Sequence, residues 1–171
     1  TLFNLNCIFI AMKLKIFILS FVLSLLIGSV TSADQKTSGI NFYSGMFDFS
    51  DNNKRSTLVG VEHQNENLYR DTIFGRVSPV TGMMITADNA AYVYTGIEAN
   101  IDLGLFKFTP SFTPGLYSQG EGKDLGHPLE FKSEVQLSMD LGESTNFGMS
   151  YNHVSNASLG EKNPGANSYM F

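Results

Sequence analysis

Hydrophobic and polar residues alternate with a period of two along much of the chain. The clearest segment is 129–141, in which every odd position except Ser133 is apolar and every even position is polar. Similar alternation runs through 91–103, 105–116 and 145–155. Because successive side chains of a β-strand point to opposite faces, this pattern predicts strands with one apolar and one polar face.

Weaker strand patterns cover 39–49, 56–64 and 73–86, and turn-forming residues separate them. A last strand begins near Asn167 and is cut short at Phe171, so we expect seven full strands and a truncated eighth. Several strands run 11–13 residues, which is longer than the usual length of about 5–6 and enough for a tilted strand to cross a membrane. The expected fold is all-β, an eight-stranded antiparallel up-and-down transmembrane β-barrel.

A secreted soluble barrel is the main alternative, and in it the apolar face of each strand would point inward. The polar face of the clearest strand helps to decide between the two. Its row of Glu130, Lys132 and Glu134 suits a small wet or salt-bridged barrel interior, which favours the membrane barrel.

Two prolines lie within the predicted strand 105–116. Pro110 and Pro114 have no N–H group to donate to a neighbouring strand. We therefore expect a bulge or a local distortion in this strand.

Short and long connections alternate between the predicted strands, as in barrels with short periplasmic turns and long external loops. If the first strand starts on the periplasmic side, the short turns at 103–104 and 142–144 are periplasmic. The long segments 118–128 and 156–166 are then external loops.

The first 33 residues contain only two charged side chains, Lys13 and Lys15. A 12-residue apolar segment, 16–27, follows them, and small residues come after it. This order is typical of a secretory signal peptide, whereas a membrane-spanning helix needs about 20 apolar residues. We therefore predict that 1–33 holds upstream residues and a signal peptide, and that 34–171 is one barrel domain.

Composition excludes several classes of protein and of site. The net charge of −5 and the charged fraction of 16% fit neither a nucleic-acid-binding surface nor a disordered chain. The single Cys, Cys7, lies in residues 1–11, which we interpret as upstream sequence, so no disulfide or thiolate metal site is expected. His63 and His127 are isolated in the sequence, and we predict no metal site.

A histidine and a serine lie together at the end of the predicted strand 145–155. His153 and Ser155 are two positions apart, so they share a face with Tyr151, the apolar and outward face, near the external rim. A histidine can take the proton that makes a serine hydroxyl nucleophilic. An enzyme would aim such a pair at the bilayer if its substrate were a membrane lipid. On its own, a His-x-Ser pair is more often just a polar pair at a membrane interface.

Longer motifs surround this pair. The strand end continues as His153-Val154-Ser155-Asn156-Ala157-Ser158-Leu159-Gly160, and then comes Asn163-Pro164-Gly165. A second segment is Thr109-Pro110-Ser111-Phe112-Thr113-Pro114-Gly115-Leu116-Tyr117, followed by Gly122-Lys123-Asp124-Leu125-Gly126 and Glu130-Phe131. These segments resemble the lipid A 3-O-deacylase family (PagL-type acyloxyacyl hydrolases). The similarity spans roughly 58–171 and is most specific from Thr109 onward.

The resemblance implies an eight-stranded barrel in the bacterial outer membrane, with its active site facing the outer leaflet. The implied activity is that of an esterase that removes an ester-linked 3-hydroxyacyl chain from lipid A of lipopolysaccharide. The implied partners are this substrate and the outer membrane. No cofactor is expected, and a homodimer is left open.

The resemblance also assigns roles to residues near the strand end. Ser155 would be the nucleophile and His153 the general base. Asn156, with a backbone N–H near Ala157 or Ser158, would form the oxyanion hole.

One position departs from the family pattern. Asn163 and Gly165 match a loop motif of the family, but the triad Glu that should follow two residues later is Asn167 here. An Asn can orient a histidine through its amide oxygen but cannot stabilise the imidazolium with charge. Three outcomes follow: a slow enzyme, a substitute acid such as Glu161, or a catalytically inactive or structural barrel. The non-enzymatic alternative predicts that both residues lie far from His153.

Overall fold

The computed structural model describes residues 38–65, 67–73, 75–142 and 145–171 of the 171-residue chain. In these ranges the regular structure consists of nine strands: β1 (Gly39–Phe47), β2 (Ser56–Gln64), β3 (Arg70–Thr72), β4 (Gly75–Thr86), β5 (Ala91–Asp102), β6 (Lys107–Ser118), β7 (Leu129–Asp140), β8 (Asn146–Ser155) and β9 (Ala166–Met170). Over the same residues, no helix is long and apolar enough to cross a membrane. The predicted leader, 1–33, lies outside the described residues, as do residues 34–37.

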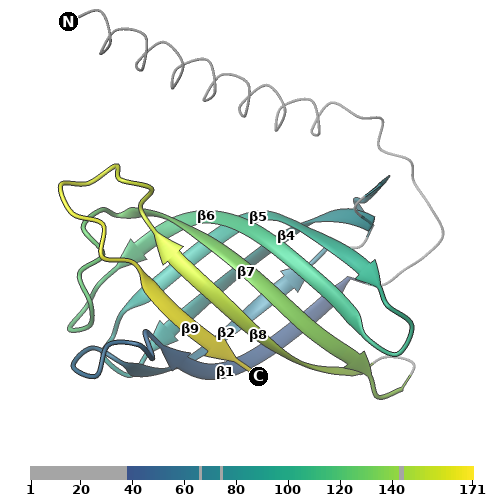
Figure 1. The fold of residues 1–171 in the computed structure, drawn as a ribbon, viewed down its shortest axis with the longest axis horizontal. Coiled ribbons are helices and arrows are strands. Elements are labelled where there is room, and N and C mark those ends of the chain that lie inside the picture. The colour runs from purple at the N-terminus through teal and green to yellow at the C-terminus, as the bar shows by residue number, and fades with distance from the viewer. Residues whose placement is uncertain (1–37, 66, 74, 143–144) are drawn as a thin grey trace, which may run out of the picture. The chain divides into compact units, whose positions relative to one another are not determined.

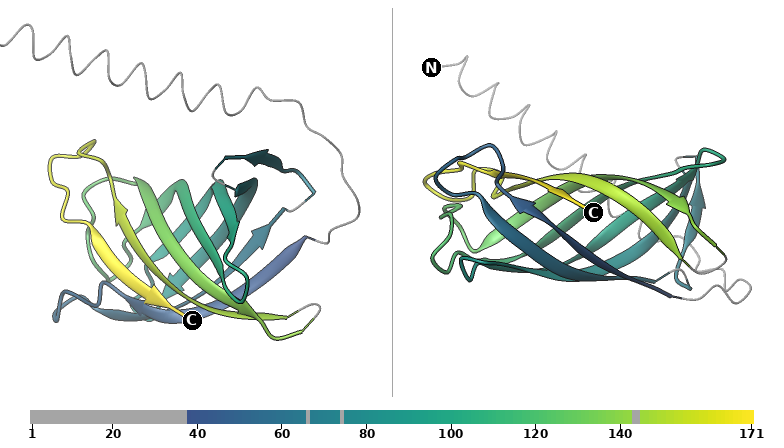
Figure 2. Two further views of the ribbon diagram at one scale, coloured as in Figure 1. Left: turned by 45° about the vertical axis from the view of Figure 1, so that its right-hand side comes forward. Right: turned by 90° about the horizontal axis from the view of Figure 1, so that it is seen from below.

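The strands form one antiparallel sheet that closes on itself (Figures 1 and 2). Its order is β2-β1-β9-β8-β7-β6-β5-β4-β3, and the additional pairing of β2 with β4 closes a barrel of eight strands. The predicted eight-stranded antiparallel barrel is confirmed. The three-residue β3, which pairs with the beginning of β4, is not anticipated by the sequence pattern.

The barrel wall carries its polar side chains inside and its apolar side chains outside. In β7, Glu130 and Lys132 are at most 1% exposed, whereas Val135 and Leu137 are more than 40% exposed. A soluble barrel has the opposite arrangement, with the apolar face inward. The soluble-barrel alternative is therefore wrong.

A network of charged and phenolic groups fills the middle of the barrel, as the polar row in β7 predicts. Lys132 Nζ lies 2.7 Å from Glu134 Oε2 and 3.6 Å from Glu62 Oε2. The same ammonium group lies over the ring of Tyr94, whose hydroxyl donates to Glu62. The hydroxyls of Tyr43 and Tyr94 are also hydrogen-bonded, at 3.0 Å. We call these five residues the interior network.

The two prolines of β6 leave its register unchanged. Pro110 lies opposite Val135 and Pro114 opposite Phe131, in an unbroken series of pairs with β7. On the other side, the pairing with β5 is interrupted opposite both prolines and resumes without a shift. Of the two expected outcomes, the bulge is absent, because no residue is inserted, and the local distortion is present. The distortion is limited to missing pairs on one edge, where proline has no N–H to donate.

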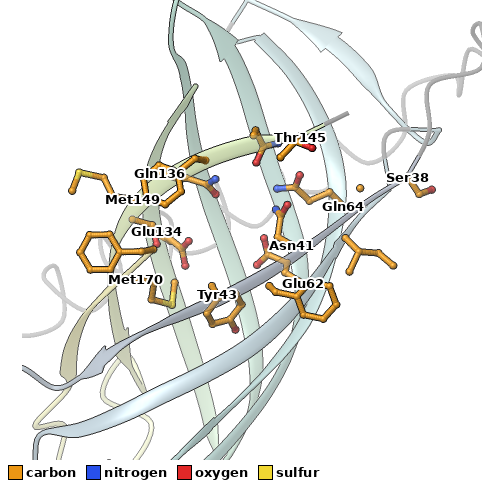
Figure 3. A pocket seen from close by; sticks show the side chains of 18 residues that line it. Ser38, Asn41, Tyr43, Glu62, Gln64, Glu134, Gln136, Thr145, Met149 and Met170 are labelled. Carbon is orange, nitrogen blue, oxygen red and sulfur yellow. The ribbon is translucent and has the colours of Figure 1, made fainter. Parts of the chain in front are cut away.

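The short strand β9 begins next to the residue where the sequence predicts the truncated eighth strand. It pairs with β8 through all five of its residues and with β1 through two. Beyond its end, a cavity of about 610 Å³ lies between β1 and β8 (Figure 3). Polar side chains of the barrel interior line this cavity, among them Asn41, Glu62, Gln64, Glu134 and Gln136.

Long loops gather at one end of the barrel, which is the left end in Figure 1. They are the connections 48–55, 119–128 and 156–165, and the short connection 87–90 lies at the same end. The short turn 103–106 lies at the opposite end. The end with the long loops matches the rim predicted to be external, and it carries the candidate site.

Candidate functional site

The last residues of β8 alternate between the two sides of the barrel wall. Asn152 and Val154 are fully buried inside, whereas His153 is exposed and Ser155 is partly exposed on the outer side. The neighbouring strand β9 places Asn167 directly opposite His153. The two residues of the predicted catalytic pair therefore share the outer face, as the period of two requires.

His153 is held by one of its ring nitrogens. Its Nδ1 lies 2.8 Å from Asn167 Oδ1, and the Tyr151 hydroxyl donates to the same oxygen, also at 2.8 Å. Because a carboxamide oxygen only accepts, the proton of the imidazole must be on Nδ1. Nε2 forms no hydrogen bond with any residue that the structure describes and is available as a base.

The structure distinguishes between the two candidates for the triad acid. Asn167 contacts His153, whereas Glu161 is exposed and forms no ion pair or hydrogen bond with the described residues. The expectation from the non-enzymatic alternative, that both would be distant from His153, is wrong for Asn167. A substitute role for Glu161 has no support in this geometry.

Ser155 is not hydrogen-bonded to His153. Its Oγ has no hydrogen-bond partner within the described parts of the chain. Hydrogen bonds between catalytic groups are often long without substrate and shorten only in the complex. The pair is thus adjacent on one face but not yet in contact.

The loop motif provides the surface against which the imidazole packs. Gly165 has a φ of +62°, and a Cβ there would lie 2.7 Å from His153 Cε1 and 3.2 Å from Nε2. Both the left-handed backbone and the close approach of the ring require a glycine at this position. This residue was expected from the motif alone, and its contact with the imidazole supplies the reason.

Asn156 holds the long loop together instead of facing the reaction site. Its Nδ2 donates to the carbonyl oxygens of Leu125 and Lys162, each at 2.8 Å, and its Oδ1 accepts the N–H of Ser158 at 2.9 Å. Its own N–H donates to Asn163 Oδ1 at 3.1 Å. Asn156 and a backbone N–H near Ala157 or Ser158 were expected to form the oxyanion hole. The Asn156 amide and the Ser158 N–H are engaged within the loop, which leaves the Ala157 N–H as the candidate donor among these groups.

A tight turn follows Ser155 directly. Ala157 and Ser158 have φ values of +52° and +64°, and the Leu159 N–H donates to the Asn156 carbonyl at 3.0 Å. Two consecutive non-glycine residues in the left-handed region are strained, and such strain is concentrated at functional sites. The Ala157 N–H has no hydrogen-bond partner in the described structure. It is the unused donor nearest in sequence to Ser155.

A second group of residues contacts Asn167, and the sequence pattern did not predict these contacts. Asp48 and Ser50 follow β1, and both contact Asn167 across more than a hundred positions of sequence. Lys123, from the loop 119–128, forms an ion pair with Asp48. A local sequence pattern cannot predict such contacts, because they depend on how the barrel closes. We call His153, Asn167, Ser50, Asp48 and Lys123 the rim network.

An exposed ion pair connects the two longest loops. Lys162 Nζ lies 2.6 Å from Asp124 Oδ2. The hydrogen bond from Lys162 and that from the Gly126 N–H hold the pKa of Asp124 below its usual value. Together with the bonds of Asn156, this pair fixes the loop 156–165 against the loop 119–128.

Comparison with known proteins shows the family and the fold of this chain. The family model for lipid A 3-O-deacylase (PagL) matches residues 37–171. The chain belongs to the lipid A 3-O-deacylase family. The crystal structure of the outer membrane enzyme PagL has a similar fold, with a TM-score of 0.58 and 16% sequence identity, over 78% of this chain and 95% of that chain. A search of curated proteins gives no match.

Within this lipid A 3-O-deacylase fold, the motif of the loop 119–128 has clear structural roles. Lys123 pairs with the buried Asp48, and the Leu125 carbonyl accepts a hydrogen bond from Asn156. A Cβ on Gly126 would lie 2.3 Å from the Lys162 carbonyl, so the two loops meet there. The residues of this motif therefore support the candidate site, while β8 and β9 carry the candidate residues His153, Ser155 and Asn167.

Proposed function

We propose that this member of the lipid A 3-O-deacylase family is an outer-membrane esterase. It removes an ester-linked 3-hydroxyacyl chain from lipid A of lipopolysaccharide, with its active site facing the outer leaflet. One observation carries the proposal: His153 lies exposed on the apolar outer face, with Nδ1 held by Asn167, Nε2 free and Ser155 beside it.

The outer surface of the barrel supports the location. Large apolar side chains are exposed on it, including Val135, Leu137, Phe147, Met149 and Tyr151. Such a surface is stable in lipid and unfavourable in water. We infer that the predicted signal peptide in 1–33 directs export and that the reactive pair lies at the level of the outer leaflet.

The proposed reaction begins with attack on the ester. Ser155 Oγ forms a bond to the ester carbonyl carbon, and His153 Nε2 takes the hydroxyl proton. The negative charge develops on the carbonyl oxygen, and the free N–H of Ala157 is the proposed donor to it. The tetrahedral intermediate then expels the sugar oxygen, which takes the proton from His153.

Water completes the proposed reaction. His153 Nε2 accepts a proton from a water molecule, and the resulting hydroxide attacks the acyl-Ser155 ester. The serine oxygen leaves with the proton, and the 3-hydroxy fatty acid is released. Every protein group in these steps comes from one chain, and the chemistry requires no cofactor.

Asn167 lowers the expected rate of ester hydrolysis but keeps the hydrogen bond that orients His153. Replacing the triad acid by Asn in a serine protease costs about 10⁴ in rate, because the histidine then adopts the wrong tautomer. Here the amide oxygen, and not the amide nitrogen, faces His153 Nδ1. The correct tautomer is kept, so we expect a smaller loss, due mainly to the absent negative charge.

The test is release of 3-hydroxy fatty acid from lipid A in detergent by the purified full chain. We expect Ser155→Ala and His153→Asn to lower the rate by at least about 10³-fold, as for removal of members of a catalytic triad. Ser44→Ala, which alters an exposed serine of β1, is the matched control. The proposal fails if the wild type releases no fatty acid or if Ser155→Ala releases as much.

A structural barrel without catalytic activity is the second candidate, and the uncharged Asn167 favours it. In this case the wild type and Ser155→Ala are equally inactive, although both fold and insert into membranes. Measuring fatty acid release and membrane insertion on the same preparations distinguishes this outcome from a misfolded enzyme.

A further inference from the structure

Asp48 is a carboxylate buried just beyond the end of β1. Its side chain is 1% exposed, and its backbone has a φ of +48°, a conformation that Asp tolerates better than most residues. A buried carboxylate is costly unless it is paired and hydrogen-bonded. Lys123 Nζ lies 2.5 Å from Oδ2, and Oδ1 accepts hydrogen bonds from Ser50 Oγ and the Asn167 N–H. The rim network therefore includes a charged group that the proposed chemistry does not use.

The order of donors in this network follows from the carboxylate. Asp48 has no proton to give, so the Ser50 hydroxyl must donate to it, at 3.3 Å. The lone pair of Ser50 Oγ then accepts from Asn167 Nδ2, also at 3.3 Å. With its nitrogen directed toward Ser50, the amide of Asn167 directs its oxygen toward His153.

The amide orientation in turn selects the tautomer of the histidine. An oxygen opposite Nδ1 requires a proton on Nδ1 and leaves the lone pair on Nε2. If the amide were reversed, its nitrogen would face Nδ1 and favour a proton on Nε2, where it cannot act as a base toward Ser155. Two further contacts restrain Asn167. The Tyr151 hydroxyl donates to Oδ1 at 2.8 Å, and the Phe49 N–H donates to the main-chain carbonyl at 3.0 Å.

We propose that Asp48 is a positioning residue for the Ser155–His153 pair. Through Ser50 it fixes the amide of Asn167 so that His153 carries its proton on Nδ1. This inference rests on the proposed function. Because Lys123 neutralises the carboxylate at close range, Asp48 acts on the orientation of these groups and adds little negative charge at the imidazole.

The test compares Asp48→Asn with Asp51→Asn in the full chain in detergent micelles. Asp51 also lies near Lys123, at 3.7 Å, but has no hydrogen bond to Ser50 or Asn167, so it is a matched control. We expect Asp48→Asn to lower kcat on the order of 10- to 100-fold, as for outer hydrogen-bond partners of metal-bound histidines. KM should stay within about two-fold, because no group that touches the substrate changes.

A ¹⁵N NMR measurement of the imidazole nitrogens gives a readout independent of activity. We expect His153 to be protonated on Nδ1 in the wild type and in Asp51→Asn, and to show a large Nε2–H population in Asp48→Asn. Unchanged tautomer and kcat in Asp48→Asn overturn the inference. A wild type without esterase activity overturns the proposed function, while the tautomer populations still decide the role of Asp48.

Two further variants keep the test decisive if Asp48→Asn does not fold. Ser50→Ala removes the bridging hydroxyl and leaves the Asp48–Lys123 pair intact, so it should shift the tautomer in the same direction. Asn167→Glu places a carboxylate directly at His153. In that background Asp48→Asn should cost less than about three-fold in kcat, because the outer partner is bypassed. Equal losses in both backgrounds overturn the inference.

Discussion

The interior network and the rim network are built from similar residues, but they differ in whether every charged or basic group has a partner. In the interior, Lys132 is 1% exposed and its ammonium group meets two carboxylates and an aromatic ring. At the rim, the network begins with a buried carboxylate but ends at an exposed imidazole with one free nitrogen. A saturated network holds the barrel, whereas the rim network presents an unused base at the surface.

Backbone conformation separates the two regions as well. The residues of the interior network lie within regular strands, and none of them has a positive φ. The rim contains positive φ values at Asp48, Ala157, Ser158 and Gly165. Strained backbone next to a free lone pair is a better guide to function than a cluster of charges alone.

We expect the largest effect on stability from a substitution that removes the cation of the interior network. Lys132→Met leaves the carboxylates of Glu62 and Glu134 without their cation, and we expect a loss of about 3–5 kcal/mol in the free energy of unfolding. Reversible unfolding by urea in lipid vesicles measures it. The control is Lys107→Met, which breaks an ion pair whose side chains are 43% and 54% exposed. It should change stability by only about 0–1 kcal/mol. Similar values for both would mean that the interior network does not hold the barrel.

We expect a smaller effect from a substitution that disturbs the packing of the His153 imidazole against Gly165. In Gly165→Ala the new methyl would displace His153, and a misplacement of about 1 Å can lower kcat about 100-fold. Gly104→Ala is the control, because Gly104 also has a positive φ, of +85°, but nothing within 4 Å of its Cβ position. Steady-state kinetics on lipid A should show a loss for Gly165→Ala alone. Equal losses would assign the effect to backbone strain and not to the contact with His153.

The smallest effect concerns the exposed pair that joins the two long loops. The pKa of Asp124 is lowered from its ordinary value of 3.8, mainly by its hydrogen bond with Lys162. A lowered pKa in the folded protein means that the contribution is present above the ordinary pKa and is lost as the pH falls through the folded value. We expect the Gly126 amide resonance of Asp124→Asn to differ from wild type at pH 7 and to approach it only at a pH below the ordinary pKa of 3.8. Activity at neutral pH should change less than about two-fold. Divergence that persists at low pH would contradict this account.

The fold could be predicted because a barrel wall has only two faces. The period of two assigns every residue of β7 to a side, and the row of charges in that strand indicates which side is enclosed. The three residues of β3 are too few to form a pattern. The prolines of β6 were expected to cause a bulge or a local distortion. Only the pairing with β5 is interrupted, and the sequence does not show which edge of the strand a missing N–H would face.

The site could be predicted only in part. His153 and Ser155 share a face by spacing alone, and the resemblance directs attention to Asn167. The bonds of Asn156 could not be foreseen, because a motif names residues without saying whether a side chain faces solvent or a neighbouring loop. Asp48 was missed since its contact with Asn167 joins the two ends of the barrel domain, 119 positions apart.

The outward direction of His153 also determines how such an enzyme meets its substrate. For the esterase that we propose, protein and lipid share one leaflet, so encounters occur by lateral diffusion in two dimensions. The quantity that sets the rate is then the mole fraction of substrate in the surface, and bulk concentration has little meaning. Adding inert detergent at constant lipid A should slow the reaction by surface dilution, although neither the protein nor its substrate has changed.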